Sequence, residues 1–161
     1  MIRKLITGIA CVIVAAVLPA CDATTFEKLR PGVSTALEVR DLMGAPTMEW
    51  KEADGSVVWE YPRTPNGVEN FMITIGPDKV LREIRQVLTD ENFARVSPGM
   101  SKEDIRRLLG KPASEVYFER KKELVWDWKT KSEGNSEWFF NVHFDETGRV
   151  LRTSTSQAPG P

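Results

Sequence analysis

The stretch FARVSPGMSKEDIRRLLGKP at residues 93–112 decides the fold, because a closely similar stretch, FEKLRPGVSTALEVRDLMGAP, already occupies residues 26–46. Each begins with an aromatic residue, continues with an aliphatic residue three positions later, and then has the turn signal Pro-Gly. The copies start 67 residues apart, at Phe26 and Phe93, which is too long a period for most solenoid repeats. The spacing therefore predicts a duplicated small unit.

Each copy predicts one short helix with defined ends. In both, a hydroxyl residue precedes an acid by three positions, as in a capping box: Thr35 and Glu38, then Ser101 and Asp104. Apolar residues follow at helical spacing: Val39, Leu42 and Met43, then Ile105, Leu108 and Leu109. Gly44 and Gly110 come next, and a proline two residues later forbids continuation. A helix of about nine residues is marginal alone in water, so we expect packing of the apolar stripe to stabilise it.

Alternating apolar residues after each helix predict strands separated by turns. Aromatic residues recur at equivalent positions: Trp59 and Tyr61, then Trp126 and Trp128. We expect them to form core beneath the helices rather than a ligand-binding surface. Alternation places Glu60 and Asp127 on the opposite face, where we expect them to meet solvent. The predicted fold class is α+β: two tandem small units, each with short helices followed by an antiparallel three- or four-stranded meander. We expect the units to pack side by side, an arrangement that would allow them to share sheet edges.

The N-terminus has the features of a secretory signal. Arg3 and Lys4 precede an apolar run that is shorter than the roughly 20 residues a membrane-spanning helix needs. Residues 18–21, Leu-Pro-Ala-Cys, resemble the lipobox of bacterial lipoproteins, which implies that Cys21 is acylated and becomes the mature N-terminus. The alternative is ordinary cleavage near Ala20, which would leave Cys21 as an oxidisable free thiol.

The predicted organisation is a lipoprotein signal peptide at 1–20, a lipidated linker at 21–25, units at 26–89 and 90–155, and a disordered tail at 156–161. Loss of the signal leaves 141 residues with Cys21 as the single cysteine, so burial of apolar surface must hold the fold together. These residues include 20 basic and 23 acidic side chains, with both signs scattered. The absence of a basic stripe argues against nucleic-acid binding.

The sequence offers few groups for catalysis or metal binding. His143 is its only histidine, and it has no Gly-rich phosphate loop and no Gly-x-Ser-x-Gly elbow. We therefore predict no enzymatic activity, no cofactor and no metal. By alternation, His143 shares a strand face with Phe139 and Asn141, and these three residues are the candidate binding surface. The simpler interpretation of His143 is a half-exposed strand histidine, because catalysis would need a positioned partner.

The combined pattern resembles the SmpA/OmlA domain family, the fold of BamE. The resemblance rests on the Pro-Gly turns, on LMGAP at 42–46 and LLGKP at 108–112, and on the tryptophan strands. It covers residues 26–88 and 93–155, and it implies a lipoprotein of the outer-membrane β-barrel assembly machinery. This chain departs from the family pattern in having two copies. It also has Asp22 after the cysteine, which resembles the signal that retains lipoproteins in the inner membrane of enteric bacteria.

Two functions are expected from this resemblance. The first is a non-enzymatic envelope lipoprotein, anchored in the outer membrane and facing the periplasm, that acts as an accessory or scaffold in outer-membrane protein assembly or envelope integrity. Asp22 leaves the inner membrane open as its location. The tandem units also resemble the β-lactamase inhibitor protein fold, so the alternative is a periplasmic inhibitor or sensor that captures an enzyme or ligand on its open sheet face.

Overall fold

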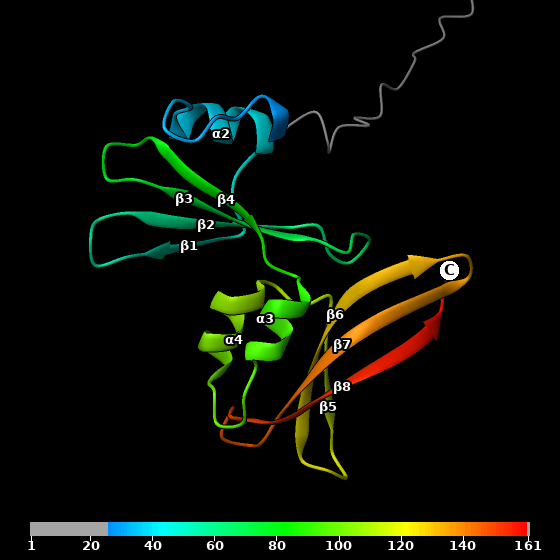
Figure 1. Cartoon of the computed structure of the whole chain (residues 1–161). Helices are drawn as coiled ribbons and strands as arrows, with labels where there is room; N and C mark the ends of the chain where they lie inside the picture. Colours follow the sequence, from blue (N-terminus) through cyan, green and yellow to red (C-terminus); the bar gives the residue numbers. More distant parts are fainter. Residues whose placement is uncertain (1–25, 161) are drawn as a thin grey trace, which may run out of the picture.

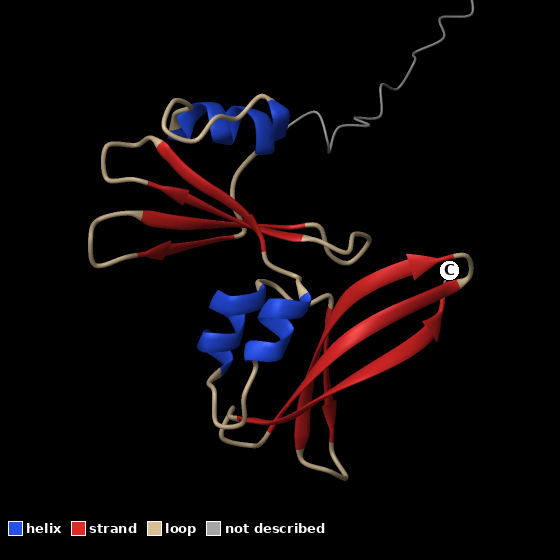
Figure 2. Cartoon of the chain, in the orientation of Figure 1, coloured by secondary structure: helices blue, strands red, loops and turns tan. Residues whose placement is uncertain are grey.

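The computed structural model describes residues 26–160. These residues form an α+β fold with two antiparallel four-stranded sheets, in the orders β1-β2-β3-β4 and β5-β6-β7-β8, which confirms the predicted class (Figures 1 and 2). In chain order the elements are α2 (Ala36–Met43), β1 (Met48–Lys51), β2 (Val57–Pro62), β3 (Asn70–Ile75), β4 (Leu81–Gln86), α3 (Asp90–Arg95), α4 (Lys102–Leu109), β5 (Ser114–Phe118), β6 (Glu123–Glu133), β7 (Ser136–Phe144) and β8 (Val150–Pro159).

Helices α2 and α4 begin and end as the sequence predicts. Complete capping boxes join Thr35 to Glu38 and Ser101 to Asp104. Both helices end at a glycine with nearly the same backbone, φ 79° and ψ −165° at Gly44 and φ 74° and ψ −167° at Gly110. Residues with a side chain rarely adopt this conformation, so glycine is needed at both positions.

Each helical region covers one face of its own sheet and forms a separate core. The first core includes Val39 of α2, Trp59 and Tyr61, and the second includes Ile105 and Leu109 of α4 with Trp126 and Trp128. All of these side chains are buried, which confirms the expectation that the recurring aromatics are core. Their burial supplies much of the hydrophobic stabilisation that the short helices require.

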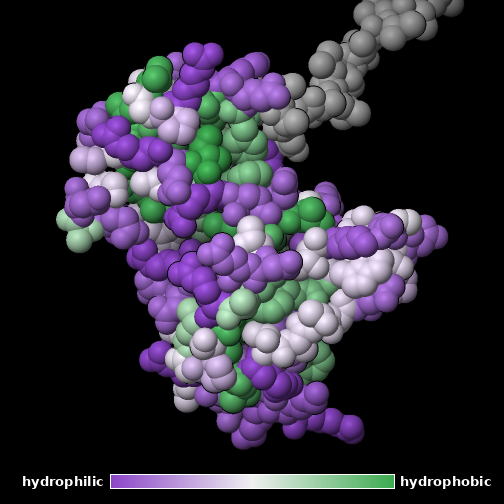
Figure 3. Space-filling view, in the orientation of Figure 1, coloured by the Kyte–Doolittle hydropathy of each residue, from purple (hydrophilic) through white to green (hydrophobic). Residues whose placement is uncertain are grey.

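The two units are stacked, because α4 also contacts the first sheet. Figure 1 shows α2, the first sheet, α3 with α4, and the second sheet following one another through the molecule. The units therefore pack through a helix of one and a sheet face of the other, and not side by side as expected. The two sheets do not share an edge, since every ladder between the named strands lies within one unit. In Figure 3, hydrophilic residues cover most of the visible side, with smaller hydrophobic areas between and below the units.

Glu60 is the clearest departure from the expectation of solvent exposure. Its side chain is fully buried, with Nε of Arg106 3.0 Å from Oε2 and the backbone N–H of Lys111 donating to Oε1 at 2.6 Å. Beside it, Asn70 Nδ2 donates to the carbonyl oxygens of Leu109 and Lys111, at 2.8 and 2.9 Å. Alternation correctly placed Glu60 opposite the first core, but that face is covered by the end of α4.

The C-terminal tail is a second correction. Residues 156–159, expected to be disordered, belong to strand β8, which pairs with β7 as far as the Ser136–Pro159 register. The reason is the length of β7, which offers hydrogen-bonding groups to this polar segment along its whole edge. The predicted signal peptide, the linker and Cys21 lie outside the described residues.

Candidate functional site

The candidate surface lies on the side of the second sheet that faces away from α3 and α4. Phe140, Val142 and Phe144 of β7 point into the second core. The alternate residues Phe139, Asn141 and His143 therefore lie on the opposite side. We call this side the open face. Its other central residues, taken from the cross-strand register, are Ser114, Val116, Phe118, Glu123, Val125, Asp127, Arg152 and Ser154.

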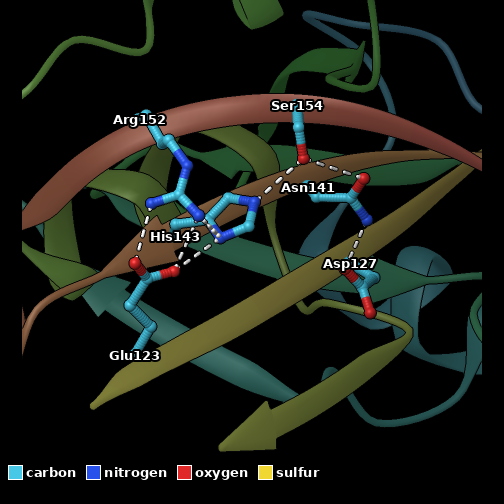
Figure 4. Close-up of polar contacts among 6 residues, drawn as sticks. All are labelled: Glu123, Asp127, Asn141, His143, Arg152 and Ser154. Atoms are coloured by element: carbon cyan, nitrogen blue, oxygen red, sulfur yellow. Dashed lines mark hydrogen bonds and ion pairs between the residues drawn. The ribbon is translucent and has the colours of Figure 1, made fainter. Parts of the chain in front are cut away.

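His143 is held by three neighbours on the open face (Figure 4). Its Nδ1 lies 3.1 Å from Oε2 of Glu123 and 3.0 Å from Nη2 of Arg152, and its Nε2 lies 2.9 Å from Oγ of Ser154. A neutral ring protonated on Nε2 would donate to Ser154 and accept from Arg152. A doubly protonated ring would donate to Glu123 instead. The ring is therefore positioned in either protonation state.

Glu123 is the electrostatic centre of this group. Arg152 contacts both carboxylate oxygens, at 2.9 and 2.8 Å. These hydrogen bonds, with a smaller contribution from His143, lower the pKa of Glu123 to about 2. The bidentate pair favours the ionised carboxylate, which thus stays charged throughout the neutral range.

A second row of hydrogen-bonded polar side chains crosses the sheet beside the His143 group. Asp127 accepts from Asn141 Nδ2 at 2.5 Å and from Ser114 Oγ at 2.8 Å, and Ser154 Oγ donates to Asn141 Oδ1 at 3.4 Å. Asn141 thereby links Asp127 to the His143 group, as Figure 4 shows. The face is cross-braced by side chains that extend over all four strands.

A shallow hollow of about 260 Å³ lies on the open face. Asn141 and His143 line it together with apolar groups of Phe118 and Val125, and Lys121 stands at its rim. Phe139 lies further along β7, opposite Lys129, and is not among the lining residues. The structure therefore brings two of the three predicted residues into one hollow and leaves the third beside it.

Ser154, His143 and Glu123 are connected in the order of a hydrolase triad, which raises the question of catalysis. Two features oppose that role. Arg152 neutralises the carboxylate that would have to stabilise an imidazolium, and its Nη2 competes with Glu123 for Nδ1. Ser154 also lies in the middle of strand β8, whose backbone amides lie in the plane of the sheet and do not converge on the face that carries its Oγ, so they cannot form an oxyanion hole there. The arrangement suits a braced binding surface better than a nucleophile.

The partners of His143 were missed by the sequence reasoning. Glu123 and Ser154 lie 20 and 11 residues away in sequence, on the strands that flank β7. Cross-strand register brings them together, and alternation within one strand does not reveal it. A strand-pairing argument that placed β7 between β6 and β8 could have found them.

Other kinds of site can be stated only for residues 26–160. In that range no group of three or more His, Cys, Asp or Glu side chains could hold a metal ion. No helix in the same range is both long and apolar enough to cross a membrane.

Comparison with known proteins relates the second unit to a family. The model of the outer membrane protein assembly factor BamE domain matches residues 86–154, from the end of β4 into β8. No curated protein matches the chain. Among solved structures, a DUF4309 family protein (YjgB) from Bacillus subtilis is 14% identical over 84% of each chain, with a TM-score of 0.31. A putative beta-lactamase inhibitor protein from Streptococcus mutans is 15% identical over 82% of this chain and 93% of its own, with a TM-score of 0.33. The family match thus covers the second unit, residues 86–154, which is less than half of the chain.

Proposed function

We propose that the chain is a non-enzymatic lipoprotein of the bacterial cell envelope that serves as an accessory or scaffold in outer-membrane protein assembly. The observation that carries this proposal is the match of residues 86–154 to the BamE domain of an outer-membrane assembly factor. Cys21 would carry the acyl groups, and the folded units would face the periplasm. A single acyl chain anchors only marginally, so the multiple chains of a mature lipoprotein are needed.

Binding to another envelope protein is the proposed mechanism, and the open face is the proposed binding surface. The polar groups of its centre are hydrogen-bonded to one another, so the surface is rigid before a partner arrives. Beside them, Val116 and Phe118 are 42% and 48% exposed and offer apolar area. A preorganised surface of mixed character suits protein recognition, because little ordering entropy is lost on binding.

A second candidate is a periplasmic inhibitor or sensor, and the hollow on the open face favours it. A mixed polar and apolar concavity can receive a protruding side chain or a small ligand. In this case the same face would meet a soluble partner rather than a membrane assembly.

Affinity purification of the native chain from fractionated membranes after cross-linking tests the proposal. Recovery of β-barrel assembly components from the outer-membrane fraction would support the first candidate. Recovery of one soluble periplasmic protein or an inner-membrane protein would replace it with the second or with another envelope role.

Cys21→Ser is the matched control for the anchor. It removes the acylation site without changing any residue of the described fold, so the variant should move to the soluble periplasm. A variant that stays fully bound to the membrane would contradict the lipid anchor.

A further inference from the structure

The internal contact between the two units shows how a sheet face of this fold receives a helix. The groups of α4 that contact the first unit are Arg106, Arg107 and the terminal Gly110, and Glu103, which pairs with Arg107, lies on the same helical face. Arg106 reaches the buried Glu60. Arg107 donates to Glu52 at 2.9 Å, and its guanidinium lies 4.5 Å from the centre of the Trp50 ring. The stack ends with α2 on one side and the open face on the other (Figure 1).

The duplication places an equivalent group on α2. Aligned through the capping boxes and terminal glycines, these positions of α4 correspond to Leu37, Arg40, Asp41 and Gly44, which we call the outer side of α2. Gly110 closely approaches its partner, since an added Cβ would lie 2.9 Å from Nδ2 of Asn70. At Gly44 the same Cβ would meet nothing within 4 Å. The outer side of α2 has the backbone shape for docking and no unit docked on it.

The acceptor position is also duplicated. Asp127 of β6 occupies the register position of Glu60 in β2. Glu60 accepts from the Arg106 side chain and from the Lys111 N–H just beyond α4. The equivalents at α2 are Arg40, which pairs with Glu49 and stacks on Trp59 of its own sheet, and Ala45, whose N–H has no partner among residues 26–160. The Ala45 N–H is available to a carboxylate placed like Asp127.

The remaining positions on the outer side of α2 and on the open face differ from their equivalents at the junction between the units, and the differences on the two surfaces are complementary. Within the chain, Arg107 pairs both with Glu52 of the first unit and with Glu103 of its own helix. On α2 these two positions are Leu37, which is 67% exposed, and Asp41, which forms no ion pair among the described residues. On the open face, the position of Glu52 is taken by Phe118, with the cation Lys121 beside it on the rim.

We propose, resting on the proposed role of the open face as the binding surface, that the chain assembles head to tail, with the outer side of α2 in one copy docked on the open face of the next and the open face of the terminal copy left for another envelope protein. The Ala45 N–H approaches Asp127, Leu37 covers Phe118 and Val116, and Asp41 faces Lys121. The contact repeats between copies the geometry that α4 and the first sheet use within one chain. Because it joins two different surfaces, it is heterologous and extends into a linear assembly unless the rotation closes a ring.

Two single substitutions separate the two surfaces. Leu37→Lys places a cation against the apolar Phe118 and Val116 and blocks the outer side of α2, whereas Val116→Lys blocks the open face. Both residues are already exposed in the described fold, so the variants should fold. Tyr117→Lys is the matched control, because Tyr117 is similarly exposed at 46% and adjacent in β5 but points to the other face.

Sedimentation velocity over a concentration series is the experiment, with Cys21→Ser in every protein so that acyl groups do not associate. We expect the parent and Tyr117→Lys to form larger species as concentration rises, and Leu37→Lys and Val116→Lys each to stay monomeric. An equimolar mixture of the two monomeric variants retains one intact outer side and one intact open face, so it should form a 1:1 dimer and nothing larger. A parent that stays monomeric throughout, a mixture that forms no dimer, or equal loss in Tyr117→Lys would overturn the proposal.

Discussion

Glu60 and Asp127 stand at the same position of two copies of one sheet, yet they have different surroundings. Glu60 is fully buried beneath the end of α4 and paired with Arg106, whereas Asp127 is bonded to Asn141 and Ser114 on a face that nothing in residues 26–160 covers. The contrast shows that the two sheets present equivalent faces, of which one joins the units. The other face retained its acid and acquired a network of its own.

Substituting Glu60 and Asp127 should give the largest difference in stability between the two faces. Glu60→Ala leaves the partly buried Arg106 without its counter-ion and the Lys111 N–H without an acceptor, so we expect a loss of about 3 kcal/mol in the free energy of unfolding. Asp127→Ala should cost about 1 kcal/mol, because water can replace its hydrogen bonds. Urea denaturation of both variants measures the difference. Equal losses would mean that the two faces are not energetically distinct.

The terminal glycines give a second paired test. Gly44→Ala and Gly110→Ala both place a side chain at positive φ, at a cost of about 1–3 kcal/mol each. Gly110→Ala additionally forces Asn70 away from the end of α4, so it should be the more destabilising by about 1 kcal/mol or more. Thermal or chemical unfolding of the two variants in parallel checks the order. A larger effect at Gly44 would contradict the close approach at Gly110.

Loss of the amide at the unit junction should have an intermediate effect. Asn70→Ala removes two hydrogen bonds to the backbone that follows α4 and should cost about 1–3 kcal/mol. Phe139 occupies the equivalent position of β7, and Phe139→Ala should instead weaken partner binding more than stability. The free energy of unfolding and the recovery of cross-linked partners are measured for both variants. A junction residue should change mainly the first quantity, and a residue of a binding face mainly the second.

The smallest effect is expected in the acid range. The pKa of Glu123 falls from an ordinary value of 4.5 to about 2 in the folded chain, so the unfolded chain binds the proton more readily. Its stabilisation is therefore complete above about pH 4.5 and is lost as the pH falls towards 2. Glu123→Gln should lower the stability slightly near neutrality, where the ionised pair is complete, and reduce the steepness of stability against pH in this window. An unchanged slope would indicate that the Arg152 pair does not form in solution.

Local patterns predicted much of this fold, because its helices and strands follow rules that act over a few residues. Capping boxes, terminal glycines and alternating aromatics placed both helices and both cores. The burial of Glu60 could not be predicted, since alternation tells which face a residue occupies and not whether another unit covers it. The segment at 156–159 is polar, and its own residues do not predict a strand. It becomes one because the edge of β7 supplies its hydrogen-bonding partners.

The candidate surface was predicted in outline only. Phe139, Asn141 and His143 do share one face, but what makes that face distinctive is the set of contacts with Glu123, Arg152 and Ser154 on adjacent strands. Such contacts depend on register, which a single strand does not specify.

Site-specific photo-cross-linking in cells tests most directly the claim that the open face is the binding surface. A photoreactive residue at position 116 lies on that face, and one at position 117, with similar exposure, points to the opposite side of β5. We predict protein adducts from position 116 and few or none from position 117. Adducts from position 117 alone, or equal yields from both positions, would contradict the account.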